Sequence, residues 1–205
     1  EFGFGILKTL LWYSLTVIAG LAVLTFIEYP LLLKIFTKIK IRDFFSVQKQ
    51  VLAVAFSTSS SAATLPVTMD VCEKRLGVPN RIASFVLPLG TTVNMDGTAL
   101  YQAVATMFIA QVYGFDLTIA QQLTIVLTAA LAAVGTAPVP GVGLIMLIIV
   151  LRSVGIPEEG IALIIGVDRL LDMCRTIPNV LADSLACVVI ASSEGELGPI
   201  NLKEA

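Results

Sequence analysis

The sequence predicts an all-α integral membrane protein with three transmembrane helices and two oppositely oriented re-entrant helical hairpins that form an inverted repeat. Of its 205 residues, 57% are hydrophobic and 14% are charged, whereas ordinary soluble chains carry about 25% charged residues. Charge-free runs cover residues 9–27, 97–115 and 117–151. They are continuous rather than alternating, which favours helices over a β-barrel. Two apolar units are interrupted by tracts rich in Ser, Gly and Pro, and these tracts predict the hairpins.

The first apolar unit, residues 4–36, is long enough to predict a transmembrane helix. Residues 80–114 predict a second one, broken by the sequence Asn-Met-Asp-Gly-Thr at 94–98. Asp96 is the only charge between residues 82 and 115. Gly97 beside it allows backbone carbonyls to turn away from helical hydrogen bonding. Asp96 is expected to help bind a cation, with capping of the helix break as the alternative.

Residues 43–77 and 117–155 predict the two re-entrant hairpins. Each has an apolar limb on either side of a helix-breaking tract, at 57–66 in the first and 135–143 in the second. A turn at membrane depth leaves backbone groups unpaired in lipid, so it must be buried in protein or line a cavity. We therefore expect the two tips to meet inside the protein. The alternative is a pair of ordinary kinked spans.

The hairpins and polar helices alternate along the chain. Pro66 precedes Asp96 by 30 residues and Pro140 precedes Asp172 by 32, a near-equal spacing. Broken helices in corresponding positions of two halves are typical of the binding site of a secondary transporter. The positive-inside rule places the first hairpin's ends in the cytoplasm and the second hairpin's ends outside. The basic residues that mark the cytoplasmic side are Lys34, Lys38, Lys40, Arg42, Lys49, Lys74, Arg75 and Arg81.

The fifth unit, residues 158–192, predicts a transmembrane helix with a ladder of polar residues. They lie at 168, 172, 175, 179 and 183, and these steps keep them on one helix face. The ladder spans about 22 Å at the usual helical rise, most of a bilayer's hydrocarbon thickness. Carboxylates and an arginine on one face of an apolar helix are costly, which indicates ligand binding.

The ladder residues suggest an anion site beside a cation site, which suits a zwitterion with an extra carboxylate. Arg175 offers a planar fork for a carboxylate, and Asp172 lies close enough to pair with it or to hold an ammonium group. Asp183, like Asp96, is a candidate ligand for a small hard cation such as Na⁺, together with freed backbone carbonyls. A buried Asp172–Arg175 ion pair without ligand is the alternative. Asp168 is expected nearer the outer end, solvated by interfacial water.

Composition argues against several other classes of protein. The chain has no histidine, and its three cysteines lack CxxC spacing, so neither a zinc site nor a disulfide framework is indicated. No basic cluster with interleaved aromatic residues suggests nucleic-acid binding. No lysine that could activate a serine lies within a predicted membrane core, so we expect no enzyme. Glu1-Phe2 opens almost directly onto an apolar span, which suggests a piece of a longer chain.

Four ordered motifs resemble those of the glutamate/aspartate:cation symporter family (dicarboxylate/amino acid:cation symporters). They are Thr-Ser-Ser-Ser-Ala-Ala-Thr-Leu-Pro at 58–66, Asn-Met-Asp-Gly-Thr at 94–98, Gly-Thr-Ala-Pro-Val-Pro-Gly-Val-Gly at 135–143, and the ladder at 168–183. The resemblance covers nearly the whole chain but only the C-terminal half of a typical member. It implies that residues 1–205 form one mobile, elevator-type transport domain. The N-terminal scaffold, through which the family forms homotrimers, is absent.

The resemblance implies a role for each matched position. The ammonium group of the substrate would bind Asp172 and its side-chain carboxylate Arg175. The remaining substrate contacts would come from Ser59, Ser61, Thr98, Val139, Gly143, Thr176 and Asn179. One Na⁺ would bind Gly90, Asn94, Asn179 and Asp183; a second would bind Thr92, Ala133, Val134 and Thr136; and a third would bind Asn94 and Asp96 with a helix absent from the chain.

The chain departs from the family pattern at several places. The family commonly has an arginine at one of two positions that are Ser59 and Met173 here, and Arg169 is a candidate to replace its charge. Pro138 stands where a glycine is frequent, which puts the flexibility of the second tip in question. Pro178 lies inside the ladder and is expected to kink the helix or free a backbone carbonyl.

The leading expectation is therefore Na⁺-coupled symport of L-aspartate or L-glutamate by a multi-pass protein of the plasma membrane, the inner membrane in a prokaryote. The alternatives are a ligand-binding fragment that cannot transport, an H⁺-coupled carrier of dicarboxylates or neutral amino acids, and an anion-conducting channel.

Overall fold

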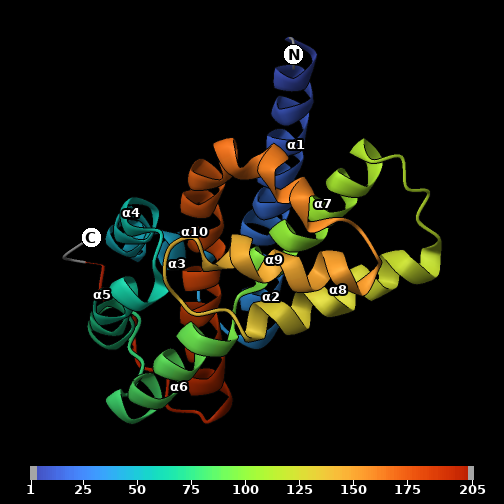
Figure 1. Cartoon of the computed structure of the whole chain (residues 1–205). Helices are drawn as coiled ribbons and strands as arrows, with labels where there is room; N and C mark the ends of the chain where they lie inside the picture. Colours follow the sequence, from blue (N-terminus) through green and yellow to red (C-terminus); the bar gives the residue numbers. More distant parts are fainter. Residues whose placement is uncertain (1–3, 203–205) are drawn as a thin grey trace.

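The structure, a computed structural model, describes residues 4–202, and every regular element in that range is helical (Figure 1). The elements are α1 (Phe4–Val23), the π-helical turn η1 (Leu24–Glu28), α2 (Tyr29–Phe36), α3 (Ile41–Val47), α4 (Lys49–Thr58), α5 (Ser61–Lys74), α6 (Asn80–Val93), α7 (Asp96–Val112), α8 (Ile119–Val134), α9 (Val142–Ser153), the 3₁₀ turn η2 (Glu158–Gly160) and α10 (Ile161–Ser193).

The long helix α10 lies at the centre of the molecule, with α4 and α5 on one side and α8 and α9 on the other (Figure 1). Two apolar cores flank it. The first joins α2–α6 to the C-terminal half of α10, through residues such as Phe44, Val71, Leu87 and Leu181. The second joins α1 and α7–α9 to its N-terminal half, through residues such as Val17, Ile125, Leu147 and Leu171. The polar ladder therefore lies where the two cores adjoin.

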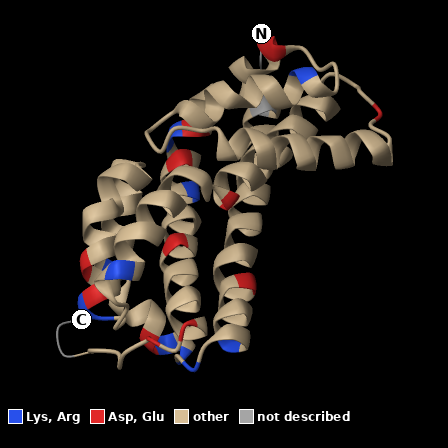
Figure 2. Ribbon diagram, turned by 90° about the horizontal axis from the view of Figure 1, so that it is seen from below, with Lys and Arg blue, Asp and Glu red and all other residues tan. Residues whose placement is uncertain are grey.

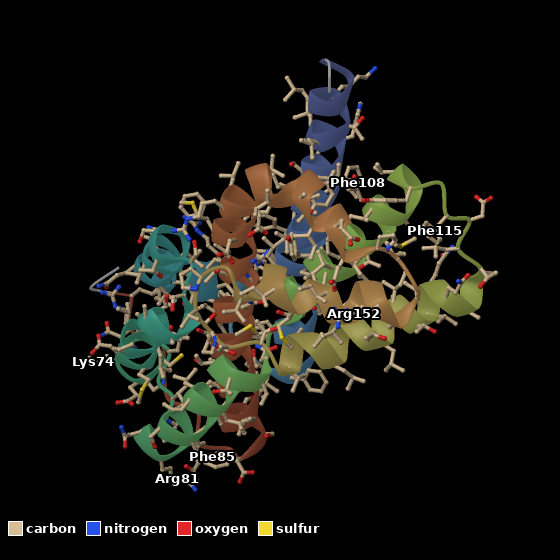
Figure 3. All side chains as sticks on the ribbon, in the orientation of Figure 1. Lys74, Arg81, Phe85, Phe108, Phe115 and Arg152 are labelled. Carbon is tan, nitrogen blue, oxygen red and sulfur yellow. The ribbon has the colours of Figure 1, made fainter. Side chains whose placement is uncertain are left out.

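Two helical segments are long and apolar enough to cross a membrane. They are Leu7–Phe36, 30 residues through α1, η1 and α2, and Glu158–Ser193, 36 residues through η2 and α10. At the usual helical rise the first is about 45 Å long. The helices α8 and α9 are apolar but shorter. Large apolar side chains, among them Phe85 and Phe115, project from the surface (Figure 3), as suits contact with lipid or with further protein.

The helix breaks are shorter than the sequence tracts predicted. In the first hairpin only Ser59 and Ser60 interrupt the helices, because Ser59 adopts a left-handed φ of 52° and the Ser60 side chain caps α5 by accepting a hydrogen bond from the Ala63 amide. Pro66 lies inside α5. A proline there removes only its own amide from the hydrogen-bond ladder, so packing can retain the helix. The residues before α4 form the separate helix α3, which was not predicted from the sequence.

The break in the third unit is likewise confined to Asn94 and Met95, since Asp96, Gly97 and Thr98 already form the first turn of α7. In α10 the helix continues through Pro178 from Ile161 to Ser193. Pro178 has no amide hydrogen for the Cys174 carbonyl, so one carbonyl loses its helical partner without ending the helix.

Candidate functional site

The polar ladder of α10 faces the interior of the molecule. Its members from Asp168 to Asp183 are all buried, with exposed fractions of 6% or less. They are Asp168, Asp172, Arg175, Asn179 and Asp183, and the neighbouring Thr176 is buried as well. Placing this set away from water is costly unless each group has a partner. The partners come from α10 itself, from α6 and α7 with the break between them, and from the turn between α8 and α9.

Arg175 is the most heavily contacted member of the ladder. Its guanidinium donates to Asp168 at 3.0 Å and lies 2.8 Å from an Asp172 oxygen, the latter an ion pair without hydrogen-bond alignment. The ring of Tyr101 on α7 lies beneath the guanidinium, with 4.0 Å from its carbon to the ring centroid, a cation–π geometry. The alternative of a direct Asp172–Arg175 pair is thus present in this conformation.

The expectation that interfacial water solvates Asp168 is wrong. Asp168 is buried and paired with Arg175. The two residues are seven positions apart, two helical turns, so they share a face. The N-terminal half of α10 is covered by α1 and α7. That cover could not be deduced from the ladder spacing alone. Arg169, in contrast, is largely exposed, and its guanidinium lies 3.8 Å from Asp172.

The two interhelical turns meet beside the ladder. The Pro138 carbonyl accepts hydrogen bonds from the Ser60 hydroxyl at 2.8 Å and from the Ala62 amide at 3.2 Å. The second turn is also tied to α10, because the Gly141 amide donates to Asp172 at 2.9 Å. The contact between tips that the sequence reading expected is therefore present, and it joins residues about eighty positions apart.

A small cavity of about 20 Å³ lies at this junction, room for about one water molecule. All nine residues predicted to contact substrate line it: Ser59, Ser61, Thr98, Val139, Gly143, Asp172, Arg175, Thr176 and Asn179. Met95, Thr136, Ala137 and Pro138 complete the lining. Sites for ligands of drug size are roughly 300–1,000 Å³, so this conformation is closed around its own ion pairs.

The residues of α7 hold Asn179 and the second turn in place. Asn179 donates to the Thr98 hydroxyl at 3.0 Å and accepts from the Gly97 amide at 2.9 Å. A Cβ on Gly97 would lie 2.6 Å from the Arg175 carbonyl oxygen, so this close approach requires glycine. Gln102 donates to the Gly143 carbonyl at 3.0 Å. Sequence reasoning missed Gln102, although its position one helical turn after Thr98 was a usable signal.

The first predicted cation set is brought together around Asp183. Its carboxylate accepts from Asn94 at 2.9 Å and from Thr91 at 3.3 Å, and Asn94 also contacts the Asn179 carbonyl at 3.4 Å. A Cβ on Gly90 would lie 2.7 Å from an Asp183 oxygen, so the Gly90 backbone is adjacent. Within residues 4–202 this carboxylate has no basic partner. Its surroundings are amide, hydroxyl and carbonyl groups, and oxygen donors are what a hard cation prefers.

The second predicted set is only partly assembled. Ala133, Val134 and Thr136 lie at the end of α8, where the Thr136 amide donates to the Ala133 carbonyl at 3.0 Å. Thr92 lies at the end of α6, which packs against α8. Among the described residues no hydrogen bond joins Thr92 to the other three.

Asp96, of the third set, has a partner that the sequence did not reveal. The hydroxyl of Tyr29, buried at the start of α2, donates to its carboxylate and lies 3.3 Å from the Pro178 carbonyl. The Gly97 amide donates to Asp96 at 2.9 Å. Tyr29 directly follows the π-helical turn η1, a distortion often found at functional sites. No local sequence pattern distinguishes Tyr29 from other tyrosines in apolar segments. Clusters of three or more Cys, Asp or Glu side chains that could hold a metal do not occur in residues 4–202.

Comparison with known proteins gives the family. The model of the sodium:dicarboxylate symporter family matches residues 1–193. The chain belongs to this family. Sodium:dicarboxylate symporters are transporters rather than enzymes and form a multi-pass membrane family, so the recognition from motifs, the expectation of no enzyme and the expected plasma-membrane location are confirmed at the level of the family.

Curated relatives of this chain carry the name excitatory amino acid transporter. One from Caenorhabditis elegans is 45% identical over 183 residues, covering 89% of the chain and 36% of the relative. Excitatory amino acid transporter 1 of Rattus norvegicus is 49% identical over 178 residues, or 87% of the chain and 33% of the relative. Excitatory amino acid transporter 4 of Mus musculus is 50% identical over 178 residues. The chain spans about a third of the length of these relatives.

Proposed function

We propose that this chain forms the substrate- and cation-binding part of a Na⁺-coupled symporter of acidic amino acids, L-aspartate or L-glutamate. The observation that carries the proposal is the buried Arg175. It shares one cavity with Asp172, and this cavity lies beside the two interhelical turns. A carboxylate beside a guanidinium presents complementary charges to an amino acid that has a second carboxylate. The relatives' name, excitatory amino acid transporter, supports this substrate class.

In the proposed complex the substrate replaces the internal ion pairs. Its side-chain carboxylate takes the Arg175 guanidinium from Asp168 and Asp172, and its ammonium group takes the Asp172 carboxylate that this exchange frees. Thr98, Thr176 and Asn179 supply hydroxyl and amide contacts. The backbone of the two turns, at Ser59, Ser61, Val139 and Gly143, completes the site. Since the cavity holds about one water molecule when closed, entry of substrate requires one turn to move.

Asp172 links substrate binding to the second turn. Its carboxylate accepts from the Gly141 amide, and the substrate ammonium competes for the same carboxylate. We therefore propose that residues 117–155 act as the extracellular gate and that residues 43–77 form the opposing hairpin, both re-entrant and related as an inverted repeat. Residues 1–205 then act as one elevator-type domain that moves against a trimeric scaffold.

Cation coupling follows from the charge balance of the site. Asp183 is buried and Asp96 is half-buried, and neither carboxylate has a basic partner in the described range. The substrate adds net negative charge. Bound cations offset this charge. Three sets of ligands are proposed for Na⁺. The first is Asp183 with Gly90, Asn94 and Asn179, and the second is Thr92 with Ala133, Val134 and Thr136. The third is Asn94 with Asp96 and the Tyr29 hydroxyl. Proton coupling at a carboxylate is the competing arrangement.

The decisive experiment is isothermal titration calorimetry of aspartate, glutamate and serine, each with and without Na⁺. The wild-type protein is compared with Arg175→Ala and with the control Arg152→Ala. Arg152 is exposed and pairs with Glu158 outside the site. We expect tight binding of an acidic amino acid only with Na⁺, a loss of at least 100-fold in Arg175→Ala, and no change in Arg152→Ala.

Unchanged aspartate affinity in Arg175→Ala would sink the assignment. Tight binding without Na⁺ that depends on pH would favour the H⁺-coupled alternative, and preference for serine would favour a neutral substrate. Uptake that fails to saturate would indicate a channel, whereas binding without uptake would indicate a binding-only protein.

A further inference from the structure

A dense group of basic residues directly follows the first long apolar helix. Between residues 34 and 49 there are five basic side chains and one acidic one, Asp43. The basic residues, all exposed, are Lys34, Lys38, Lys40, Arg42 and Lys49. In Figure 2 blue segments lie along the lower edge of the molecule, opposite the N-terminus, with red segments among them. None of the five forms an ion pair with any residue in the range 4–202. Their charges are therefore available to an external anion.

The backbone that carries these charges is well anchored. Thr37 closes the end of α2, with its amide and hydroxyl donating to the Leu33 carbonyl at 2.9 and 2.7 Å. The Ile39 amide donates to the Thr37 hydroxyl at 3.2 Å. The Ser192 hydroxyl of α10 donates to the Phe36 carbonyl at 3.1 Å, and Phe44 of α3 is buried in the core. Since the loop is anchored at both ends, Lys38, Lys40 and Arg42 project from a fixed platform.

Two surface grooves adjoin this platform. One, of about 480 Å³, is lined by Lys38, Lys40, Asp43, Ser192 and residues of the segment 195–200. The other, of about 460 Å³, is lined by Lys40, Arg42, Asp43, Ser46 and Leu202. The segment 195–200 forms a stable wall, because the Gly198 amide donates to the Gly77 carbonyl at 2.8 Å and the following Asn201 amide donates to the Arg75 carbonyl at 2.8 Å. Lys40 and Asp43 line both grooves, so an anion between them meets three cations and one carboxylate, which leaves the surface net positive.

Exposed apolar side chains next to the basic ones in the sequence point to a lipid rather than a soluble anion. Ile35, Phe36 and Ile41 are 61%, 54% and 40% exposed, and they adjoin the basic side chains in the sequence. A phospholipid offers both parts of this pattern, a phosphate for the cations and acyl chains for the apolar residues. The position suits it as well, just beyond the end of the apolar segment Leu7–Phe36 on the side that the positive-inside rule assigns to the cytoplasm.

We propose that Lys38, Lys40 and Arg42, with the wall 195–200, form a binding surface for the phosphate headgroup of an anionic phospholipid in the cytoplasmic leaflet. This headgroup surface lies at the far end of α10 from Asp168 and shares no residue with the substrate cavity. It holds whether or not the protein transports acidic amino acids.

The test measures the lipid that the wild-type protein retains. The protein is purified in detergent with equal amounts of phosphatidylglycerol and phosphatidylcholine. Native mass spectrometry counts the bound lipids. The variant is Lys38→Gln with Lys40→Gln, and the matched control is Lys8→Gln with Arg152→Gln, two exposed basic residues elsewhere. We expect preferential retention of phosphatidylglycerol, a loss of about fivefold for each neutralised lysine of the headgroup surface, and no loss in the control.

Equal retention of phosphatidylglycerol by the two double variants would overturn the proposal, and so would equal retention of the two lipids by the unaltered protein. A second arm adds excess inorganic phosphate. Displacement of phosphatidylglycerol by phosphate alone would identify a free-anion site and overturn the assignment to lipid, whereas retention supports it. Size-exclusion profiles of both variants check that folding is unchanged.

Discussion

At the residue scale, the site is a balance of buried charges around Arg175. Three groups hold it: Asp168, Asp172 and the ring of Tyr101. Removing one partner of a buried ion pair is costly because it leaves the other charge uncompensated. The site without substrate therefore avoids unpaired charge by pairing internally. In the proposed complex an acidic amino acid replaces the Asp172–Arg175 pair, because its ammonium group and its side-chain carboxylate pair with these two side chains.

Asp183 provides a prediction at the same scale. In Asp183→Asn the shape of the side chain is kept but its charge is lost, so a bound cation loses a charged ligand. We expect the Na⁺ concentration needed for half-maximal aspartate binding to rise about tenfold or more. Sodium titrations of aspartate binding by calorimetry give this value. Asp116→Asn, in the exposed loop between α7 and α8, is the control, and a sodium curve that is identical in all three proteins would contradict the assignment of Asp183.

At the element scale, the contact between α7 and α10 depends on glycine. A Cβ on Gly97 would lie 2.6 Å from the Arg175 carbonyl, 2.7 Å from the Pro178 ring and 2.9 Å from the Asn179 side chain. Two of these atoms belong to the backbone or a proline ring and cannot rotate away. Helices in membranes approach closely at small residues of this kind, and here the approach also sets the position of Asn179.

Gly97→Ala is therefore expected to destabilise the protein by about 1–3 kcal/mol through overpacking. Gly166→Ala is the matched control on α10, where an added Cβ meets no atom within 4 Å. Thermal unfolding of the purified protein, followed by size exclusion after heating, measures the difference. Equal melting temperatures for Gly97→Ala and Gly166→Ala would show that the helices can separate without cost.

Ser60 supplies one of the two hydrogen bonds that join the two interhelical turns at the Pro138 carbonyl. Its hydroxyl donates to the Pro138 carbonyl and accepts from the Ala63 amide. Ser60→Ala removes both bonds, at a cost of about 1 kcal/mol for the cap alone. We expect faster hydrogen–deuterium exchange in residues 60–64 and 136–141 of this variant.

Ser57→Ala serves as the comparison, because the Ser57 hydroxyl contacts only the Val54 carbonyl of its own helix. Mass spectrometry of peptic fragments resolves both segments. If exchange near residue 138 is the same in the two variants, the turns are held together by other contacts.

At the scale of the whole molecule, the charge distribution predicts how the protein lies in the membrane. Lys38 lies in the basic segment after α2, and Asp116 lies in the loop between α7 and α8. By the positive-inside rule these positions face opposite sides. In intact cells a membrane-impermeant thiol reagent should label Asp116→Cys, whereas Lys38→Cys should react only after the membrane is opened.

The native cysteines give a low background in that experiment, since Cys72 and Cys187 are buried and Cys174 is half-buried. Labelling of both engineered cysteines from the same side would refute the proposed orientation of the hairpins and, with it, the inverted repeat.

The sequence by itself determined the family, the helical class and the face of α10 that carries the chemistry. These follow from local rules. The apolar composition indicates that lipid surrounds the helices, and the helical period of 3.6 residues fixes which residues of one helix point the same way. All nine substrate candidates line one cavity.

Only the tertiary structure decided how these faces pair. Tyr29 reaches Asp96 across 67 positions, Ser60 reaches Pro138 across 78, and the burial of Asp168 depends on helices that cover it. The helix breaks at Ser59–Ser60 and Asn94–Met95 are likewise shorter than the local tracts indicate. The physical reason is that packing stabilises the fold through contacts between residues distant in sequence. This stabilisation keeps Pro66 and Pro178 inside helices that local propensity would end.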